Sequence, residues 1–427
     1  MRVLLVAAML VATLPVAARG QDRRCLFAVD TVGRQGVTEQ TSSGTNYYAG
    51  GYVRLRCVGT PVTMESDSVA AINGGEVAYF LREVRYRDST VAMDADRGTY
   101  FKQGERWEAR GNVRTRNLVT GSELTGPTMD YLRALPGRPE AEVYATGRPT
   151  ITYRSRNPSE EPFRIVADRV RFLGDDKVWM GGTSQVTRSD FAASADSIRM
   201  DTGTGNNGTL VGGSPVVRGM GKDPFELRGT RIDLLLRDRR LEFVTAKGKG
   251  QAETRDVNLV ADTIGLDIER DTVVQTLAWG DTSRPEAVSA DYVIRADSLA
   301  VDTPGQRLRE LRGFGRAYVE SVADSLTGEK NWLEGDTVTA RFEPATDDSS
   351  RTALRVVEAR GQARSYYQIH DAARPGAPPS IDYARGDRIV VTFRADDAVD
   401  RVDVVGRADG VHLEPAQPRP PRDTTAT

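Results

Sequence analysis

The stretch Ala195-Asp196-Ser197-Ile198-Arg199-Met200 decides the fold of this chain, together with Asn206-Asn207-Gly208 and Leu210-Val211-Gly212-Gly213, which follow it. Its first part is a phrase in which a small residue and Asp precede apolar residues that alternate with polar ones. The phrase returns about ten times at intervals of roughly 28 to 50 residues, a spacing typical of repeat architectures. Clear copies begin at Ser66-Asp67, Ala167-Asp168, Ala261-Asp262, Ala296-Asp297, Gly335-Asp336 and Gly386-Asp387, and weaker copies at Ala95-Asp96, Gly126-Pro127 and Gly229-Thr230.

Each repeat has a second half that begins with a turn and ends at a glycine. The turn is Leu173-Gly174-Asp175-Asp176 in one repeat and Asn206-Asn207-Gly208 in the next, where Asn-Gly between apolar runs is a strong hairpin signal. The other closing glycines are Gly111, Gly147, Gly248, Gly280, Gly313, Gly361 and Gly406. Because the alternation has a period of two, each run is predicted to be an antiparallel strand with one buried face. The unit is therefore a β-hairpin or a three-stranded meander, which must stack on its neighbours.

The repeated Asp invites a catalytic interpretation, and the sequence argues against it. An active site would use one copy, whereas this Asp returns at the same place in most repeats. We expect it to cap a turn or to face solvent at a strand start, where its carboxylate accepts a backbone hydrogen bond. Calcium binding is the alternative, but the glycine-rich nonapeptide signature of calcium-binding β-helices is absent. Asp94 with Asp96, and Asp175 with Asp176, are the carboxylate pairs that could act as acid and base.

Other catalytic, metal and nucleotide sites find little support in the composition. Of the 427 residues only two are histidines, His370 and His412, which makes a multi-histidine metal site or a Ser-His-Asp triad improbable. Gly248-Lys249-Gly250 lacks the remainder of a phosphate-binding loop. The net charge of -2 gives no basic footprint for nucleic acid. We therefore expect a chain that is not an enzyme and that has no cofactor, metal or nucleic-acid partner.

The two ends of the chain have compositions of their own. Residues 1–20 read as a secretory signal peptide, with Arg2 ahead of an apolar run too short for a confident membrane span. An uncleaved anchor is the alternative. Residues 414–427 are rich in proline and polar residues and are predicted to be a disordered tail. Between them we expect two stretches of β repeats, residues 21–155 and 156–413.

The only two cysteines, Cys25 and Cys57, lie near the start of the expected mature chain. In an oxidising compartment such an isolated pair is predicted to form a disulfide, although two free thiols remain the alternative.

The order of these pieces resembles the OstA-like domain of lipopolysaccharide transport, found in LptA-like periplasmic bridges and in the soluble part of LptD-like outer-membrane translocons. The best match is Met93-Asp94-Ala95-Asp96 leading to Trp107-Glu108-Ala109-Arg110-Gly111-Asn112-Val113, and the resemblance covers roughly residues 45 to 412. It implies an all-β fold, an elongated, V-shaped antiparallel β-jellyroll with the apolar face toward a groove for the acyl chains of lipid A. The chain is about twice as long as a single bridge domain, so the resemblance leaves open one long jellyroll or two in tandem.

The alternating apolar residues are the candidates for the groove lining that the resemblance implies. They are Val170, Phe172, Val178, Met180, Ile198, Met200, Leu210, Ile232, Leu234, Phe243, Ile264, Leu266, Leu299 and Val301. The alternative is that these side chains pack against one another as a closed core.

The function that the resemblance implies is a periplasmic lipid-binding bridge or chaperone, which shields acyl chains and serves outer-membrane assembly. Its implied partners are lipopolysaccharide or a related lipid, other OstA-like domains joined end to end by strand addition, the outer-membrane translocon and the inner-membrane transport complex. The implied location is the periplasm, with a further association with the outer membrane. The alternatives are a structural envelope scaffold that binds protein or glycan without lipid, and a polysaccharide-active enzyme on a β-solenoid.

Overall fold

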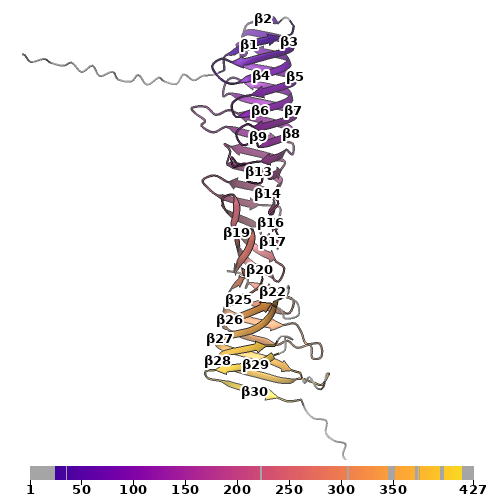
Figure 1. Ribbon diagram of the computed structural model, residues 1–427, viewed down its shortest axis with the longest axis vertical. Helices are drawn as coiled ribbons and strands as arrows, with labels where there is room; N and C mark the ends of the chain where they lie inside the picture. The colour runs from indigo at the N-terminus through magenta and orange to yellow at the C-terminus, as the bar shows by residue number, and fades with distance from the viewer. Residues whose placement is uncertain are drawn as a thin grey trace, which may run out of the picture.

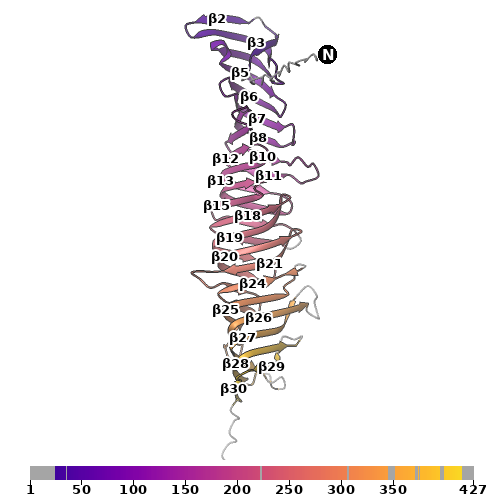
Figure 2. The ribbon, with the colours of Figure 1, turned by 90° about the vertical axis from the view of Figure 1, so that its left-hand side faces the viewer.

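The computed structural model describes residues 25–34, 36–221, 224–304, 307–344, 352–370, 374, 376–394 and 399–415. The predicted signal peptide, and the predicted tail from residue 416 onward, lie outside the described residues. The fold is all-β, as expected, and forms a long column with β2 at one end and β30 at the other (Figures 1 and 2). Within the described part of the chain, no helix has the length and apolar character needed to span a membrane.

The residues that the structure describes form thirty strands and one short 3-10 helix, η1. In the first half they are β1 (Phe27–Val32), β2 (Val37–Thr41), β3 (Gly44–Cys57), β4 (Thr63–Ile72), η1 (Asn73–Gly75), β5 (Val77–Arg87), β6 (Val91–Phe101), β7 (Arg106–Asn117), β8 (Glu123–Leu132), β9 (Glu142–Thr146), β10 (Thr150–Tyr153), β11 (Phe163–Val166), β12 (Arg169–Leu173), β13 (Lys177–Thr187), β14 (Phe191–Asp201) and β15 (Asn207–Val211). In the second half they are β16 (Val216–Gly219), β17 (Phe225–Arg228), β18 (Arg231–Arg237), β19 (Arg240–Glu253), β20 (Asn258–Glu269), β21 (Thr272–Trp279), β22 (Glu286–Val288), β23 (Tyr292–Arg295), β24 (Ser298–Asp302), β25 (Glu310–Ser321), β26 (Trp332–Pro344), β27 (Thr352–Ile369), β28 (Ser380–Phe393), β29 (Val399–Val405) and β30 (Asp409–Leu413).

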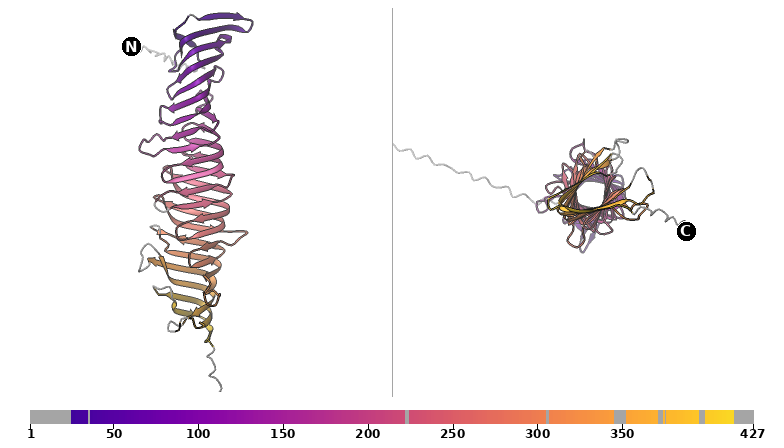
Figure 3. Two further views of the ribbon diagram at one scale, coloured as in Figure 1. Left: turned by 90° about the vertical axis from the view of Figure 1, so that its right-hand side faces the viewer. Right: turned by 90° about the horizontal axis from the view of Figure 1, so that it is seen from below.

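The strands form two walls that are joined along one side. In β13, residues 177–181 pair with β12 in the first wall, whereas residues 185–187 pair with β11 in the second wall. The register of β13 against β14 shifts between Gly181 and Ser184, where both strands bend from one wall into the other. We call this row of bends the corner. Viewed along the axis, the strands surround the centre of the column (Figure 3), and inward side chains from both walls occupy that centre.

The repeated Asp and the closing glycines meet at the corner, where they make the bend. Gly182 has φ of +71°, and a Cβ added to it would lie 2.4 Å from Oδ2 of Asp168, which lies between β11 and β12. A side chain at this position would therefore suffer both backbone strain and a clash. The same pairing recurs as Gly111 with Asp96, Gly361 with Asp336, and Gly406 with Asp387. At Asp297 the partner is Gly315, and the expected closing glycine, Gly313, packs against Ala296 instead.

The repeated Asp was expected at a strand start, but Asp96 and Asp196 lie inside β6 and β14, at the corner. The backbone hydrogen bonds expected of its carboxylate occur at Asp262. Asp96 accepts a bond of 2.8 Å from Asn112, and Asp387 accepts one of 2.9 Å from Arg407, each the residue after the corner glycine. Asp262 accepts the backbone N–H groups of residues 281–283. Hydrogen bonds from Thr282 and Ser283 hold the pKa of Asp262 well below its ordinary value. The phrase in the sequence is therefore a corner motif.

The repeating unit is a bent hairpin, and the walls are continuous along the column. A strand that crosses the corner appears in the sequence as two runs separated by Gly, which explains the apparent third run of the meander. Strand β10 pairs with β11, and β9 pairs with β12, so both walls continue across the boundary expected at residue 155. The structure is thus one long assembly with no break at that position.

Two of the sequence-based turns can be checked directly. The turn expected around Gly174 joins β12 to β13 as predicted. The hairpin expected at Asn206-Asn207-Gly208 turns earlier, at residues 202–206, and Gly208 lies inside β15. A Cβ on Gly208 would come within 3.1 Å of Leu234 Cδ1, so this glycine makes room for an inward leucine.

Candidate functional site

The apolar interior between the two walls is the candidate site, because it runs the length of the column. Its buried residues form one cluster that begins at Cys25 and ends at Phe393. The twelve predicted lining residues that lie buried in it are Val170, Val178, Met180, Ile198, Met200, Leu210, Ile232, Leu234, Ile264, Leu266, Leu299 and Val301. Phe172 is partly buried and packs against the same cluster. The period-two pattern therefore identified the inward face correctly in these strands.

Phe243 is the exception, since the structure places it outside this buried cluster. It pairs with Leu235, which is 46% exposed, and a Cβ on Gly265 of the neighbouring strand would meet its ring at 2.7 Å. The register between β18 and β19 shifts next to this pair, so that Leu241 and Val244 are the buried residues of β19 here. A β-bulge of this kind reverses the side on which the following residues point, and it leaves no mark in the alternation of the sequence.

The sequence analysis missed the inward aromatic side chains, most of which lie outside the repeated phrase. Trp107 is 1% exposed and packs between Phe80 and Tyr86, with ring centres 5.1 Å away from each. Farther along the column, Phe163 and Phe191 meet edge to face at 5.7 Å. The alternation within Val77–Arg87 and Phe191–Asp201 could have identified Phe80 and Phe191, because both stand in the inward register of their strands.

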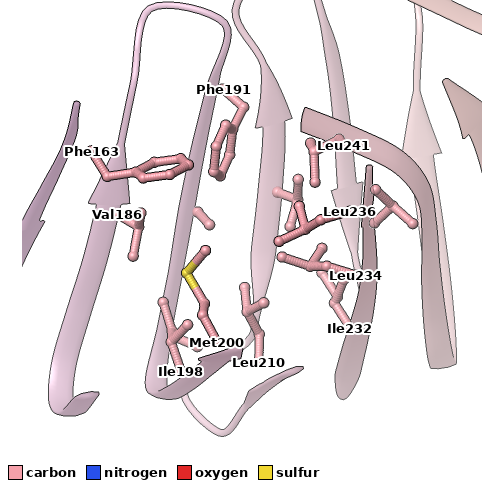
Figure 4. Packing of buried hydrophobic residues seen from close by; sticks show 14 of the residues in the cluster. Phe163, Val186, Phe191, Ile198, Met200, Leu210, Ile232, Leu234, Leu236 and Leu241 are labelled. Atoms are coloured by element: carbon pink, nitrogen blue, oxygen red, sulfur yellow. The ribbon is translucent and has the colours of Figure 1, made fainter. Parts of the chain in front are cut away.

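In the middle of the column the interior is filled by its own side chains. Figure 4 shows Ile198, Met200 and Leu210 within the buried cluster, with Phe163 and Phe191 close by. These side chains are at most 3% exposed. At this level the apolar face is a packed core and is closed to solvent, which corresponds to the closed-core alternative.

At the end that begins the described chain, the same interior opens to solvent. The inward residues Val29, Val32 and Tyr47 are 62%, 36% and 49% exposed. They line a cavity of 300 Å³ whose other walls include Leu55 and Val69. The disulfide between Cys25 and Cys57 holds the start of the chain beside the end of β3. We call this opening the mouth; it is an uncovered apolar surface that continues into the packed core.

Opposite the corner, the hairpin turns of the two walls face each other along a line that we call the seam. Asp175, in a turn of the first wall, accepts hydrogen bonds of 3.0 Å from Asn117 and 2.9 Å from Arg156, both of the second wall. Farther along, Arg188 of the second wall donates to the backbone carbonyl of Arg239 in the first wall at 3.1 Å. These polar contacts close the seam beside the packed middle of the core.

Arg239 is held in the seam by aromatic and ionic contacts. Its guanidinium lies 4.8 Å from the centre of the Tyr153 ring, and its Nε lies 3.5 Å from Glu160 Oε2. A partly desolvated arginine over an aromatic face is stabilised by the charge distribution of the ring. The side chains that close the seam here are thus far apart in sequence, which is why local patterns did not reveal them.

Buried tyrosines in the interior carry raised pKa values that can be tested. Burial raises the pKa of Tyr86 well above its ordinary value, with a further contribution from the charge of Asp88, which accepts its hydrogen bond at 3.1 Å. Burial likewise raises the pKa values of Tyr100, Tyr131 and Tyr367. A raised folded-state pKa means that the fold favours the neutral phenol, so this stability is complete below about pH 10 and is lost as the pH rises above it.

We therefore expect a tyrosine titration that is incomplete in the folded protein. Absorbance at 295 nm, followed from pH 8 to 12, should show part of the tyrosines ionising only together with the loss of β-sheet circular dichroism. The same chain in denaturant should ionise all its tyrosines in one transition near pH 10. A full absorbance change near pH 10 with the circular dichroism intact would contradict the buried placement of these rings.

No cluster of three or more His, Cys, Asp or Glu side chains able to hold a metal ion occurs among the residues that the structure describes. The two histidines each contact a carboxylate, with His370 Nε2 2.8 Å from Asp324 and His412 Nδ1 2.5 Å from Asp382. The hydrogen bond that His412 donates to Asp382 raises the pKa of His412. The carboxylates considered earlier have structural contacts, Asp96 at the corner and Asp175 at the seam.

The likeness of this chain to known proteins is found among solved structures. No protein-family model matches the sequence, and no curated protein matches it. Among solved structures, one that is similar is LptH of Pseudomonas aeruginosa, described as the LptA homologous periplasmic component of the conserved lipopolysaccharide transport device. The alignment covers 30% of this chain and 94% of LptH, with 18% sequence identity and a TM-score of 0.26.

Proposed function

We propose that this chain is a periplasmic lipid-binding bridge that shields the acyl chains of lipopolysaccharide or a related lipid between its two walls. The observation that carries the proposal is the single apolar interior, which continues along the column and opens at the mouth. Apolar surface of this kind lowers the free energy of an acyl chain by about 0.8 kcal/mol for each methylene removed from water. In this proposal the chain binds and shields lipid and catalyses no reaction.

Two further observations support a place in the periplasm. The Cys25–Cys57 disulfide belongs to an oxidising compartment, and the sequence begins with an expected signal peptide. The corner motifs described above are the residues on which the resemblance to OstA-like domains rests. An additional association with the outer membrane is part of the proposal.

The ends of the column suit end-to-end assembly. Strands β1 and β2 lie at one end of the described column and β29 and β30 at the other (Figure 1). An edge strand can accept a strand from another molecule and so extend the sheet. We propose other OstA-like domains, the outer-membrane translocon and the inner-membrane transport complex as the partners at these ends.

The packed middle of the core favours a second candidate, a structural scaffold that spans the envelope without binding lipid. For the bridge to work, the walls must part at the seam, which requires the contacts of Asp175 and Arg239 to open. In the scaffold, the same contacts remain closed.

Photo-crosslinking distinguishes the two candidates. A photoreactive residue at Phe172, which lines an interior cavity, is expected to form adducts with lipopolysaccharide in the purified periplasmic protein. The matched position is Arg171 on the same strand, which points outward and contacts the rings of Tyr144 and Trp179. It should give no adduct. If neither variant forms adducts while both keep the wild-type circular dichroism and melting temperature, the bridge is wrong and the scaffold stands.

A further inference from the structure

The seam also encloses a cavity between the last strands of the described column, beside Phe393. This cavity, which we call the window, measures 480 Å³ and lies between Val357, Phe393 and Val399 of the first wall and Val319 and Tyr367 of the second. Its volume falls in the range of small-molecule sites, about 300 to 1,000 Å³. By comparison, the cavity beside Phe172 measures 80 Å³.

The window has an apolar floor. Val319, Val357, Tyr367 and Phe393 are all less than 9% exposed, and they belong to the buried cluster that runs along the column. The floor of the window is therefore a side opening onto the same interior. Tyr292 and Phe393 meet across the seam with ring centres 6.4 Å apart, at the edge of the opening.

The rim of the window is polar and is built by a loop, residues 322–331, fixed to the end of β27. Thr327 donates a hydrogen bond of 2.6 Å to Gln368 Oε1, and Gln368 Nε2 donates one of 3.2 Å to the carbonyl of Glu329. The backbone N–H of Gln368 donates to Asn331 Oδ1 at 2.8 Å. Gln368 is 94% buried by these contacts, so the rim is an ordered edge of the cavity.

Charged groups at the rim are paired within the protein. Glu320 lies 2.8 Å from Lys330 and 3.2 Å from Arg295, and these two cations together with its hydrogen bonds hold its pKa below the ordinary value although burial opposes this. A ligand at the window would thus meet hydrogen-bonding and balanced ionic groups outside and hydrocarbon inside. This arrangement of polar groups outside and apolar groups inside fits an amphiphile with its polar head at the rim.

We propose that the window binds one acyl chain of an amphiphile, with the head at the rim and the chain against Val319, Val357 and Phe393. The inference rests on the proposed function and adds to it a defined lateral site for a single chain. The chain can come from a free fatty acid or from a larger glycolipid, because both present the same methylenes to the floor. Affinity should fall about fourfold for each methylene removed from the ligand.

Trp332 belongs to the lining of the window, and it shares the outward register of Glu320. It therefore reports on the rim, where 2-bromostearate places its bromine beside the head group. Brominated stearate quenches tryptophan fluorescence only at contact, so wild-type protein should show saturable quenching that unbrominated stearate reverses. Trp332→Phe should abolish the saturable part. Trp279→Phe is the matched control, because Trp279 is 40% exposed on β21 and does not line the window, and it should keep the quenching.

Filling the floor gives a second, independent variant. Val357→Phe should raise the half-saturation concentration of brominated stearate at least tenfold. Thr339→Phe, which lies on the neighbouring strand outside the window lining, should leave that concentration unchanged. Quenching that survives Trp332→Phe, or that falls equally in Trp279→Phe, overturns the window. This holds even if Val357→Phe fails to fold, since the Trp332 comparison does not depend on it.

Competition with lipopolysaccharide identifies the source of the chain and separates this inference from the proposed function. Displacement of brominated stearate shows that the glycolipid offers its chain to the window, and absence of displacement assigns the window to single-chain lipids. Adducts at Phe172 without Trp332 quenching support the bridge and contradict lipid binding at the window. Trp332 quenching without adducts at Phe172 supports lipid binding at the window and contradicts the bridge.

Discussion

Gly361→Ala should lower the free energy of unfolding of the segment around β26–β28 by about 3 kcal/mol, in the upper range for a single substitution. Gly361 has φ of +77°, a region that costs a residue with a Cβ roughly 1 to 2 kcal/mol. The added Cβ would also lie 2.1 Å from Asp336 Oδ2 and 2.8 Å from Asp336 Cβ, so rotation of the carboxylate cannot relieve the clash. Urea denaturation followed by circular dichroism measures the loss.

Two controls separate the clash from the backbone strain. Gly328→Ala has a similar φ of +74° with nothing within 4 Å of the new Cβ, so it should cost only about 1 kcal/mol. In an Asp336→Gly background, which removes the clashing side chain, Gly361→Ala should also cost about 1 kcal/mol. Equal costs in both backgrounds would show that Asp336 and Gly361 do not form the corner as described.

Loss of the disulfide should destabilise the mouth. The bond joins residues 32 positions apart, and closing a loop of that size stabilises the fold by roughly 3 to 4 kcal/mol in the chain-entropy model. Cys57→Ser should therefore accelerate hydrogen exchange in β1 to β5, since the backbone N–H of Cys25 would also lose its 2.8 Å bond to Glu105. Exchange mass spectrometry of the oxidised wild type and the variant provides the measurement.

The effect should remain local, because each strand contacts only its neighbours in a stacked architecture. Exchange in β13 to β20 should be unchanged within error, and that segment serves as the internal control. Faster exchange throughout the column would mean that the mouth and the packed middle unfold as one unit. No change at the mouth would mean that the cysteines are free in solution.

The sequence predicted the all-β fold because alternation with a period of two is a local property of each strand. Ile198 and Met200 alternate with Ser197 and Arg199, and the structure buries the first pair and pairs the strand antiparallel on both sides. The cysteines were predicted to pair and they do. These features depend on short stretches of sequence and on the compartment.

The corner could not be predicted, because its geometry depends on residues from neighbouring strands. Asp96 looked like the start of a strand and Gly111 like the end of one, and only their meeting across the bend shows that the chain continues through both. The prediction that Phe243 faces the interior was wrong for a related reason. The bulge beside Leu235, which reverses the alternation, involves a second strand.

The seam and the window could not be predicted from local sequence patterns. Asn117 and Asp175 are 58 residues apart, and the residues of the window come from β23, β25, β26, β27, β28 and β29. Each of these residues is of a common type for its strand, so no single stretch of sequence indicates the contacts. The interior was predictable as a face, whereas its openings were not.

The bent hairpin has a consequence for size. Neighbouring strands lie about 4.8 Å apart, so one more bent hairpin would lengthen the column by about 10 Å while leaving its cross-section unchanged. The corner pairs an Asp on one strand with a glycine on the next. A duplicated hairpin would carry both residues and so could form its own corner. The length of such a column can therefore change by whole-number steps, without redesign of the surface that it offers along its axis.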